Sequence, residues 1–223
     1  HEVDEREGGS ALATFGPGEE MKVPGRVAVW DPPNRIVFDG GEDAGPMAFE
    51  WLVEARDGGS CVVRLVNSGY GVGDEWDDQY DAMTEGWQLF MANLKLHMEH
   101  FAGQSATPSI PIATWEGTRD EAWKRLLGGL GIETQPTVGE RITLAVADGP
   151  SLSGTVTEAA PHHVLLVVDE PAPGTAFVAA EGVEGALMVS VWSYLYGDAG
   201  AAAANRDEPR WSEWLTAGAP AAT

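Results

Sequence analysis

Two histidines lie three residues apart in a segment with helical periodicity, a spacing at which side chains can chelate a metal ion. They are His97 and His100, with Glu99 between them. Two ligands do not complete a metal site, and a histidine near a helix C-terminus is stabilised by the helix dipole without any ligand. A second pair, His162 and His163, falls at an expected turn. We therefore predict structural roles for these histidines, with no metal and no cofactor.

Other reactive residue types are present without the patterns that catalysis needs. Acid–base catalysis requires a carboxylate in an apolar pocket, whereas Glu50 and Glu54 are expected to face outward. Cys61 begins an expected strand with no basic neighbour to activate it, so a packed thiol is predicted. The glycine-rich stretch 69–73 precedes acidic rather than basic residues, so it predicts a turn and not a phosphate-binding loop. No catalytic residue is predicted.

A set of aromatic and apolar residues is the remaining candidate for a binding site. Ligand cavities are mostly apolar and aromatic with a few polar groups. The same pattern is also typical of an ordinary hydrophobic core. In the second half of the chain, Trp192, Tyr194 and Tyr196 alternate in the same way. The predicted ligand-binding residues, with an arginine as polar anchor, are Phe49, Trp51, Arg64, Trp76, Tyr80, Met83 and Trp87.

Short strands separated by turn residues must position the first of these side chains. Glycine, proline and aspartate cluster between the apolar runs, as in hairpin turns. Alternation with a period of two places Phe49, Trp51 and Val53 on one face of the sheet. One apolar face has to be covered by another element. The expected strands are 2–7, 11–15, 26–30, 35–39, 47–55 and 61–67.

A long helix follows the strands and supplies the cover. Apolar residues recur at steps of three and four, with Asp74 as N-cap and Gly103 as the C-terminal stop. The predicted fold class is α+β: a curved antiparallel sheet wrapped around a long C-terminal helix, the helix-grip arrangement, which leaves room for a cavity. The predicted apolar stripe is Trp76, Tyr80, Met83, Trp87, Phe90, Leu94, Met98 and Phe101.

The second half of the chain repeats this plan, so two modules are predicted. A polar, proline-bearing stretch at 104–112 is interpreted as the linker between a domain at 1–103 and one at 113–223. The second domain begins with a helix near Thr118, continues with strands, and ends in a helix at 199–215 that Pro209 is expected to interrupt. The expected strands are 141–147, 153–159, 163–168, 175–180 and 187–196.

Charge and composition narrow the classes of partner. Lys and Arg number 13 against 35 Asp and Glu, a net charge of −22, which opposes binding to nucleic acid and to anionic membranes. The single cysteine is typical of a reducing compartment, and a cytoplasmic location is expected. No run approaches the roughly 20 apolar residues of a membrane span, and the first residues do not form a signal peptide.

Three segments also occur in a characteristic order. They are 29–38, with a turn at Asp31-Pro32; 63–70, ending in Gly69-Tyr70; and 76–94, centred on Gly86-Trp87. In this order they resemble the Hsp90-ATPase-activator-homologue branch of the START-like, or SRPBCC, superfamily. The resemblance covers residues 1–103 and implies a helix-grip domain whose first strand and helices would precede His1. The second half resembles the same superfamily more weakly, which implies a tandem pair.

The resemblance implies three alternative functions. The first is a binding protein whose helix-grip cavities hold a small lipophilic ligand. The second is a chaperone-associated regulatory protein that binds a macromolecular partner, although the separate Hsp90-binding domain of the eukaryotic activators has no counterpart in this sequence. The third is a cyclase-like or hydrolase-like enzyme that uses a pocket acid. Fold alone does not choose among them.

Overall fold

The computed structural model describes residues 2–14, 19, 22–41, 47–69, 74–183 and 186–218, with only the backbone at 74–83 and 85. The chain divides into two compact units, His1–Asp78 and Gln79–Thr223. This division falls inside a helix, whereas the sequence placed the linker at 104–112.

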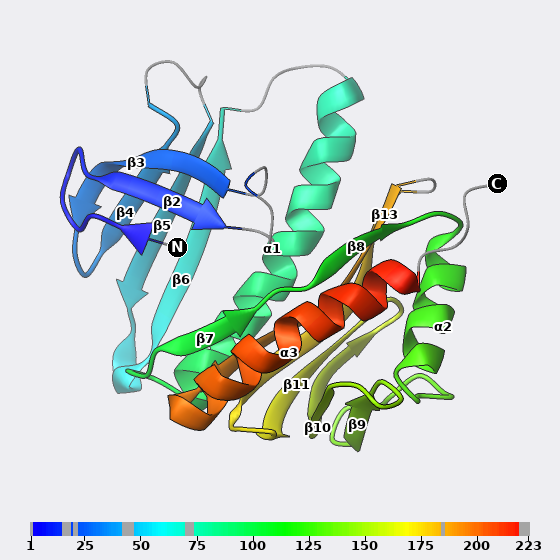
Figure 1. Ribbon diagram of the computed structural model, residues 1–223. Helices are drawn as coiled ribbons and strands as arrows, with labels where there is room; N and C mark the ends of the chain where they lie inside the picture. Colours follow the sequence, from blue (N-terminus) through cyan, green and yellow to red (C-terminus); the bar gives the residue numbers. More distant parts are fainter. Residues whose placement is uncertain are drawn as a thin grey trace. The chain divides into compact units, whose positions relative to one another are not determined.

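The first unit contains a six-stranded antiparallel meander in which every strand pairs with its neighbour in the sequence (Figure 1). All six strands lie where strands were expected, with ends that differ by a few residues. Glycine and proline in the turns end each strand and return the chain. The strands are β1 (Glu2–Val3), β2 (Ser10–Thr14), β3 (Lys22–Asp31), β4 (Arg35–Asp39), β5 (Ala48–Ala55) and β6 (Cys61–Ser68).

The two faces of this sheet differ in chemistry. Residues that pair across an antiparallel ladder point to the same face. One face therefore carries a row of apolar side chains across four strands, in which Trp30 pairs with Ile36, Ile36 with Trp51, and Trp51 with Leu65. The opposite face carries ion pairs, including Arg26 with Asp39 at 2.9 Å. The sheet is thus amphipathic, as the alternation predicted.

The predicted long helix is present as α1 (Asp74–His100), and Gly103 adopts a positive φ of 77° just after its end. The predicted stripe is only partly correct. Met98 is 53% exposed, whereas Leu89 and Leu96, outside the stripe, are buried. Leu89 and Leu96 lie seven residues apart, so the helix buries a face rotated slightly from the predicted one.

The second unit contains a seven-stranded sheet in the order β7-β13-β12-β11-β10-β9, with β8 also pairing with β13. The first strands of the unit thus pair with its last strand. The stretch 104–112, expected to be a linker, contributes β7 to this sheet, because its backbone groups pair with β13. The elements are β7 (Ala106–Ser109), β8 (Ile112–Trp115), α2 (Arg119–Gly129), β9 (Arg141–Ala145), β10 (Ser151–Ala160), β11 (His163–Glu170), β12 (Gly174–Val183), β13 (Ala186–Tyr196) and α3 (Gly197–Ala217).

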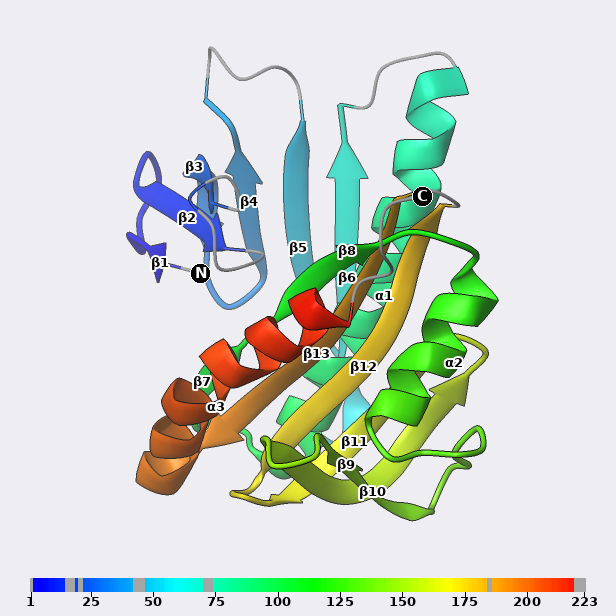
Figure 2. The same ribbon diagram turned by 45° about the vertical axis from the view of Figure 1, so that its right-hand side comes forward.

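Helices cover both faces of the second sheet. Figures 1 and 2 show α2 and α3 on one face and the C-terminal part of α1 on the other. The α2–α3 face forms the larger core, around Leu126, Leu166 and Trp211. The α1 face forms a smaller core that joins Leu89 and Leu96 to strand residues. The predicted α+β helix-grip fold class is confirmed.

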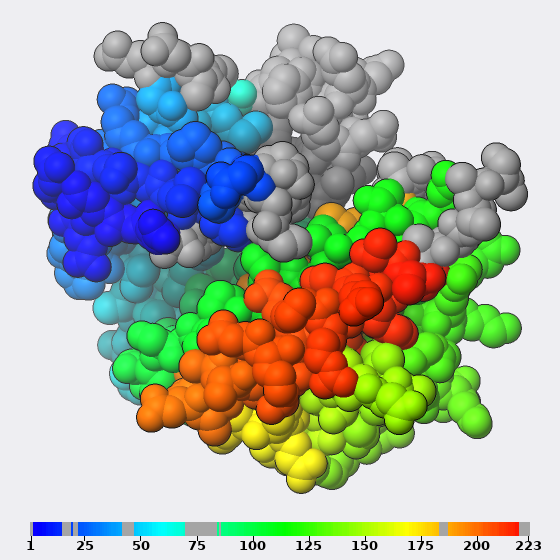
Figure 3. Space-filling model, viewed as in Figure 1, coloured from blue at the N-terminus to red at the C-terminus, as the bar shows by residue number. Residues whose placement is uncertain are grey.

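The helices α2 and α3 follow simple sequence rules, with one exception. Thr118 and Glu121 form the expected capping box at the start of α2. Pro209 does not interrupt α3, contrary to expectation. Trp211 and Leu215 are buried beyond the proline, so their packing holds the last turns in line with the rest of the helix. The outer side of α3, orange to red in Figure 3, lies at the surface.

Candidate functional site

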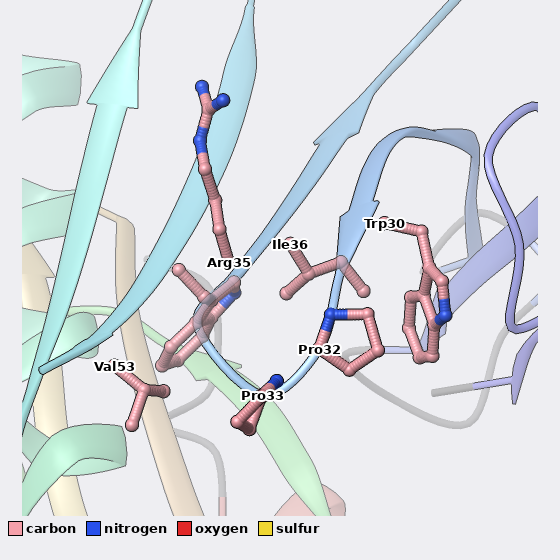
Figure 4. A pocket seen from close by; sticks show the side chains of 7 residues that line it. Trp30, Pro32, Pro33, Arg35, Ile36 and Val53 are labelled. Carbon is pink, nitrogen blue, oxygen red and sulfur yellow. The ribbon is translucent and has the colours of Figure 1, made fainter. Parts of the chain in front are cut away.

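The first unit has a hollow of about 300 Å³ beside the turn that joins β3 to β4 (Figure 4). We call it the tryptophan hollow. It lies on the apolar face of the meander, at the end of the sheet that carries the row of paired apolar side chains. Its lining consists of Trp30, Pro32, Pro33, Arg35, Ile36, Trp51 and Val53.

Strand register places the floor and two walls of the hollow. Trp30 on β3 and Trp51 on β5 both pair with Ile36 on β4. Paired side chains on adjacent strands project side by side from one face. Ile36 therefore lies between the two indoles, and all three side chains are only half-buried. The result is an apolar site open to solvent.

The turn closes one end of the hollow. The Asn34 amide donates to the Asp31 carbonyl at 2.9 Å, and the Val53 amide donates to the Asn34 carbonyl at 2.8 Å. These bonds fix the turn to β5. Pro32 and Pro33 have restricted φ and present only ring carbons from their side chains, so the end wall is rigid and apolar.

The lining has little charge to offer a ligand. Arg35 pairs with Leu52 across the ladder, and its guanidinium donates to the Glu50 carboxylate on the charged face. In Figure 4 its side chain extends away from Ile36, so the arginine borders the hollow with its stem. Among the described residues of this lining there is no carboxylate and no imidazole. The arrangement is suited to apolar contact rather than proton transfer.

The structure brings together only part of the predicted ligand-binding set. Trp51 lines the hollow, and Phe49 lies two residues along β5 on the same face. Arg64 pairs with Leu52 and approaches the Glu54 carboxylate at 3.6 Å, so it lies on the opposite face from Trp51. The expected role of Arg64 was a polar anchor for a ligand that Trp51 contacts, and strand alternation places the two side chains on opposite faces of the sheet.

The other members of the predicted set belong to α1. Trp87 is half-buried on α1, with its ring centroid 5.7 Å from that of Phe90. The side chains of Trp76, Tyr80 and Met83 lie outside the described residues. A shared ligand site for the whole set therefore stays a prediction.

Sequence reasoning missed most of the lining. Trp30, Ile36 and the two prolines were used only as part of a turn motif and a resemblance. A sufficient signal was present: Trp30 ends one expected strand and Ile36 is the second residue of the next, so a tight turn makes them cross-strand neighbours. Pairing the strands before choosing candidate residues would have found the floor and the second wall.

The other aromatic group lies in the second unit, where its rings pack against one another. Phe90 on α1 contacts Trp192, with ring centroids 5.3 Å apart. Phe101 stacks on Tyr196 at 4.1 Å, and His97 Nδ1 lies 2.7 Å from the Tyr196 hydroxyl oxygen. Burial raises the pKa of Tyr196. Burial also raises the pKa of Tyr194, so both phenols stay protonated at neutral pH.

The remaining reactive residues have structural surroundings. Glu50 and Glu54 face outward in ion pairs with Arg35 and Arg56, as predicted. The described part of the chain contains no group of three or more potential metal ligands. Cys61 is exposed, so the prediction of a packed thiol was wrong. It is the first residue of β6 and lies on the apolar face, at the end of the sheet. A side chain at this end of the sheet stays exposed although it is on the apolar face.

Comparisons with known proteins support the resemblance for the first part of the chain. Residues 1–99 match the family described as activator of Hsp90 ATPase homolog 1-like protein. No curated protein matches the chain. None of the described helices has the length and apolar character needed to cross a lipid bilayer.

Solved structures of low identity are also similar. A protein of Mesorhizobium loti is 12% identical, with a TM-score of 0.38, and covers 49% of this chain and 93% of its own. The Aha1 dimer from Colwellia psychrerythraea is 15% identical, with a TM-score of 0.37, covering 49% and 90%. The di-domain ARO/CYC BexL from the BE-7585A biosynthetic pathway is 17% identical, with a TM-score of 0.33, covering 99% and 88%.

Proposed function

We propose, on the premise that residues 1–99 match the activator of Hsp90 ATPase homolog 1-like family, that this chain binds a small lipophilic molecule and that the tryptophan hollow is its binding site. The observation that carries the proposal is the row Trp30, Ile36 and Trp51, which leaves two indoles half-buried around one hollow.

The energetics of covering this row support binding. Removing apolar surface from water contributes about 25 cal/mol per Å². A ligand that covers on the order of 50 Å² of apolar lining would therefore gain about 1.3 kcal/mol from the protein side, before its own surface is counted. The lining offers no acid or base among its described residues. Binding is thus favoured over the pocket-acid chemistry of the cyclase-like alternative.

The test is a binding titration with a small panel of apolar molecules that includes 2-naphthol and decahydro-2-naphthol. We expect at least one member to bind, and Trp51→Ala to weaken its binding at least about tenfold because a wall of the hollow is lost. Trp214→Ala is the matched control, since it removes a half-buried tryptophan from α3. Unchanged binding to Trp51→Ala, or no binding by any member, would contradict the proposal.

The family match favours a second candidate, a regulatory protein that binds a chaperone. Its test is a pull-down of purified Hsp90 by the whole chain, with and without nucleotide. Retention that survives Trp51→Ala would place partner binding on another surface, and no retention in either state would count against this candidate.

A further inference from the structure

Buried polar atoms without a protein partner are concentrated in one layer of the second unit, between α1 and the sheet (Figures 1 and 2). Four side chains carry such an atom there, and each of these residues is at most 8% exposed. The described residues supply no hydrogen bond to any of the four atoms. Nearly all buried polar atoms in native proteins are hydrogen-bonded, so this group requires an explanation. The atoms are Asn93 Oδ1 on α1, Thr175 Oγ1 on β12, and Ser190 Oγ and Trp192 Nε1 on β13.

Strand register places the three strand residues on the face that α1 covers. Trp192 belongs to the smaller core, to which α1 contributes. Ser190 and Tyr194 each lie two residues from Trp192 on β13, so they share its face. Thr175 pairs with Tyr194 and therefore lies on that face as well.

The contacts of α1 place Asn93 above the same part of the sheet. Phe90, three residues before it, has its ring centroid 5.3 Å from that of Trp192. His97, four residues after it, lies with Nδ1 2.7 Å from the Tyr196 hydroxyl oxygen. Residues at these spacings share one face of a helix. Asn93 therefore faces the sheet at a level between Trp192 and Tyr196, which is where β12 contributes its unpartnered hydroxyl.

The number of these atoms does not follow from the amount of buried surface. The opposite face of the sheet carries the larger core. Yet in the described part of the second unit the only further side-chain atom of this kind is Ser109 Oγ on β7. The remaining members of the smaller core are apolar side chains such as Leu89 and Leu165, which cannot satisfy a polar atom. The polar atoms of the α1 layer therefore need a partner from outside the chain.

The chemistry of the four atoms restricts that partner. The Trp192 indole can only donate, Asn93 Oδ1 can only accept, and the two hydroxyls can do both. A cation would meet the indole N–H, and an anion would meet the amide oxygen. The partner is therefore a neutral group that both donates and accepts. Because the rings of Phe90 and Trp192 are packed in this layer, it must also be small. Water meets both conditions, and a buried water typically makes about three hydrogen bonds.

We propose that the layer between α1 and the second sheet is a site for internal water, in which one water molecule bridges Asn93, Thr175 and Trp192. The indole N–H donates to the water oxygen, and the two water protons go to Asn93 Oδ1 and Thr175 Oγ1. Hydrogen bonds are directional, whereas apolar contacts are not. The bridge therefore fixes the position of α1 along β12 and β13. This site is independent of the tryptophan hollow and of the proposed function.

Oxygen-17 magnetic relaxation dispersion of the whole chain tests this site, because it counts water molecules that stay bound for longer than the protein takes to tumble. Thr175→Val nearly keeps the shape of the side chain and removes the hydroxyl. We expect this variant to lose about one long-lived water. Thr157→Val is the matched control, since the Thr157 hydroxyl already donates to the Leu165 carbonyl at 3.2 Å. The control should lose none.

A second variant and a crystal structure complete the test. Trp192→Phe removes the indole N–H and should also lose about one long-lived water. It supplies the comparison if a circular dichroism melt shows that Thr175→Val does not fold. In a crystal structure of the chain, a water should lie about 2.7–3.2 Å from Thr175 Oγ1 and from Trp192 Nε1. Equal water counts for the unchanged chain and the folded variants would overturn the proposal. Direct hydrogen bonds between these side chains, or a layer without water, would overturn it as well.

Discussion

The two sheets of this chain bury their apolar residues to very different degrees. In the first, Val27 is the one described apolar residue that is fully buried, at 0% exposure. In the second, Leu166 and its neighbours fill one core and Leu165 and Phe177 another, on opposite faces of the same strands. The second sheet is covered on both sides by helices, and its apolar surface is used for stability.

The contrast is clearest for tryptophan. Trp115 and Trp211 of the second unit are each 2% exposed, and the Trp115 indole donates to the Leu215 carbonyl at 2.9 Å. Trp30 and Trp51 of the first sheet are half-buried and border a hollow. Tryptophans that fill a core contribute to stability, whereas tryptophans that border a hollow remain able to contact a ligand. This difference leads us to place the binding site on the first sheet.

The largest expected effect tests the difference in burial between the two sheets directly. Leu166→Ala removes a 0% exposed side chain from the larger core, and we expect the free energy of unfolding to fall by about 3 kcal/mol. Leu65→Ala on the first sheet, where the side chain is half-buried, should cost about 1 kcal/mol. Urea denaturation followed by circular dichroism measures both. Equal losses would show that the two sheets are packed alike.

A smaller effect tests how much α1 contributes to the stability of the second sheet. Phe90 contacts Phe177 and Trp192 with ring centroids 6.2 and 5.3 Å apart. Phe90→Ala should cost about 2 kcal/mol, and the control Phe90→Leu, which keeps most of the volume, less than about 1 kcal/mol. The same urea titration applies. A loss below about 0.5 kcal/mol for the alanine variant would show that α1 does not stabilise this face.

The smallest effect concerns the charged face of the first sheet. The Arg26 guanidinium, through its hydrogen bonds, lowers the pKa of the Asp39 carboxyl. A lowered pKa in the folded state means that the pair stabilises the fold above the ordinary aspartate pKa. That contribution is lost as the pH falls through the lowered value. Asp39→Asn should therefore cost about 0.5 kcal/mol at pH 7 and almost nothing near pH 2.

The matched control for this pH dependence is Asp57→Asn, at an exposed position in the β5–β6 turn. We expect it to be neutral at both pH values. A loss for Asp39→Asn that stays constant between pH 7 and pH 2 would indicate a packing effect and not an ion pair.

Much of the fold follows from local patterns in the sequence. The strands of the first unit and the length of α1 were predicted because alternation and three–four spacing are properties of neighbouring residues. Local patterns do not indicate which element covers each apolar face. Leu89 and Leu96 are buried against β11–β13, and the long-range contact decides which helix face is covered.

The site was predicted less well than the fold, for the same reason. Trp51 was identified from its own strand, whereas Trp30 enters the site only through pairing with Ile36. Arg64 was predicted as a polar anchor, and the register of β6 places it on the other face from Trp51. The hollow is formed by side chains from three strands together, so the pattern of a single segment could not predict it.

The route by which each sheet is completed has a consequence for synthesis on the ribosome. In the first unit every strand pairs with the one before it, so the sheet can grow as the chain emerges. In the second unit, the backbone groups of Ala106 on β7 can pair only after Tyr196 on β13 has been synthesised. Contacts between distant positions form slowly. A nascent chain halted before Ala186 would therefore leave β7 and β8 without their partner strand, and would be a substrate for chaperones or proteases.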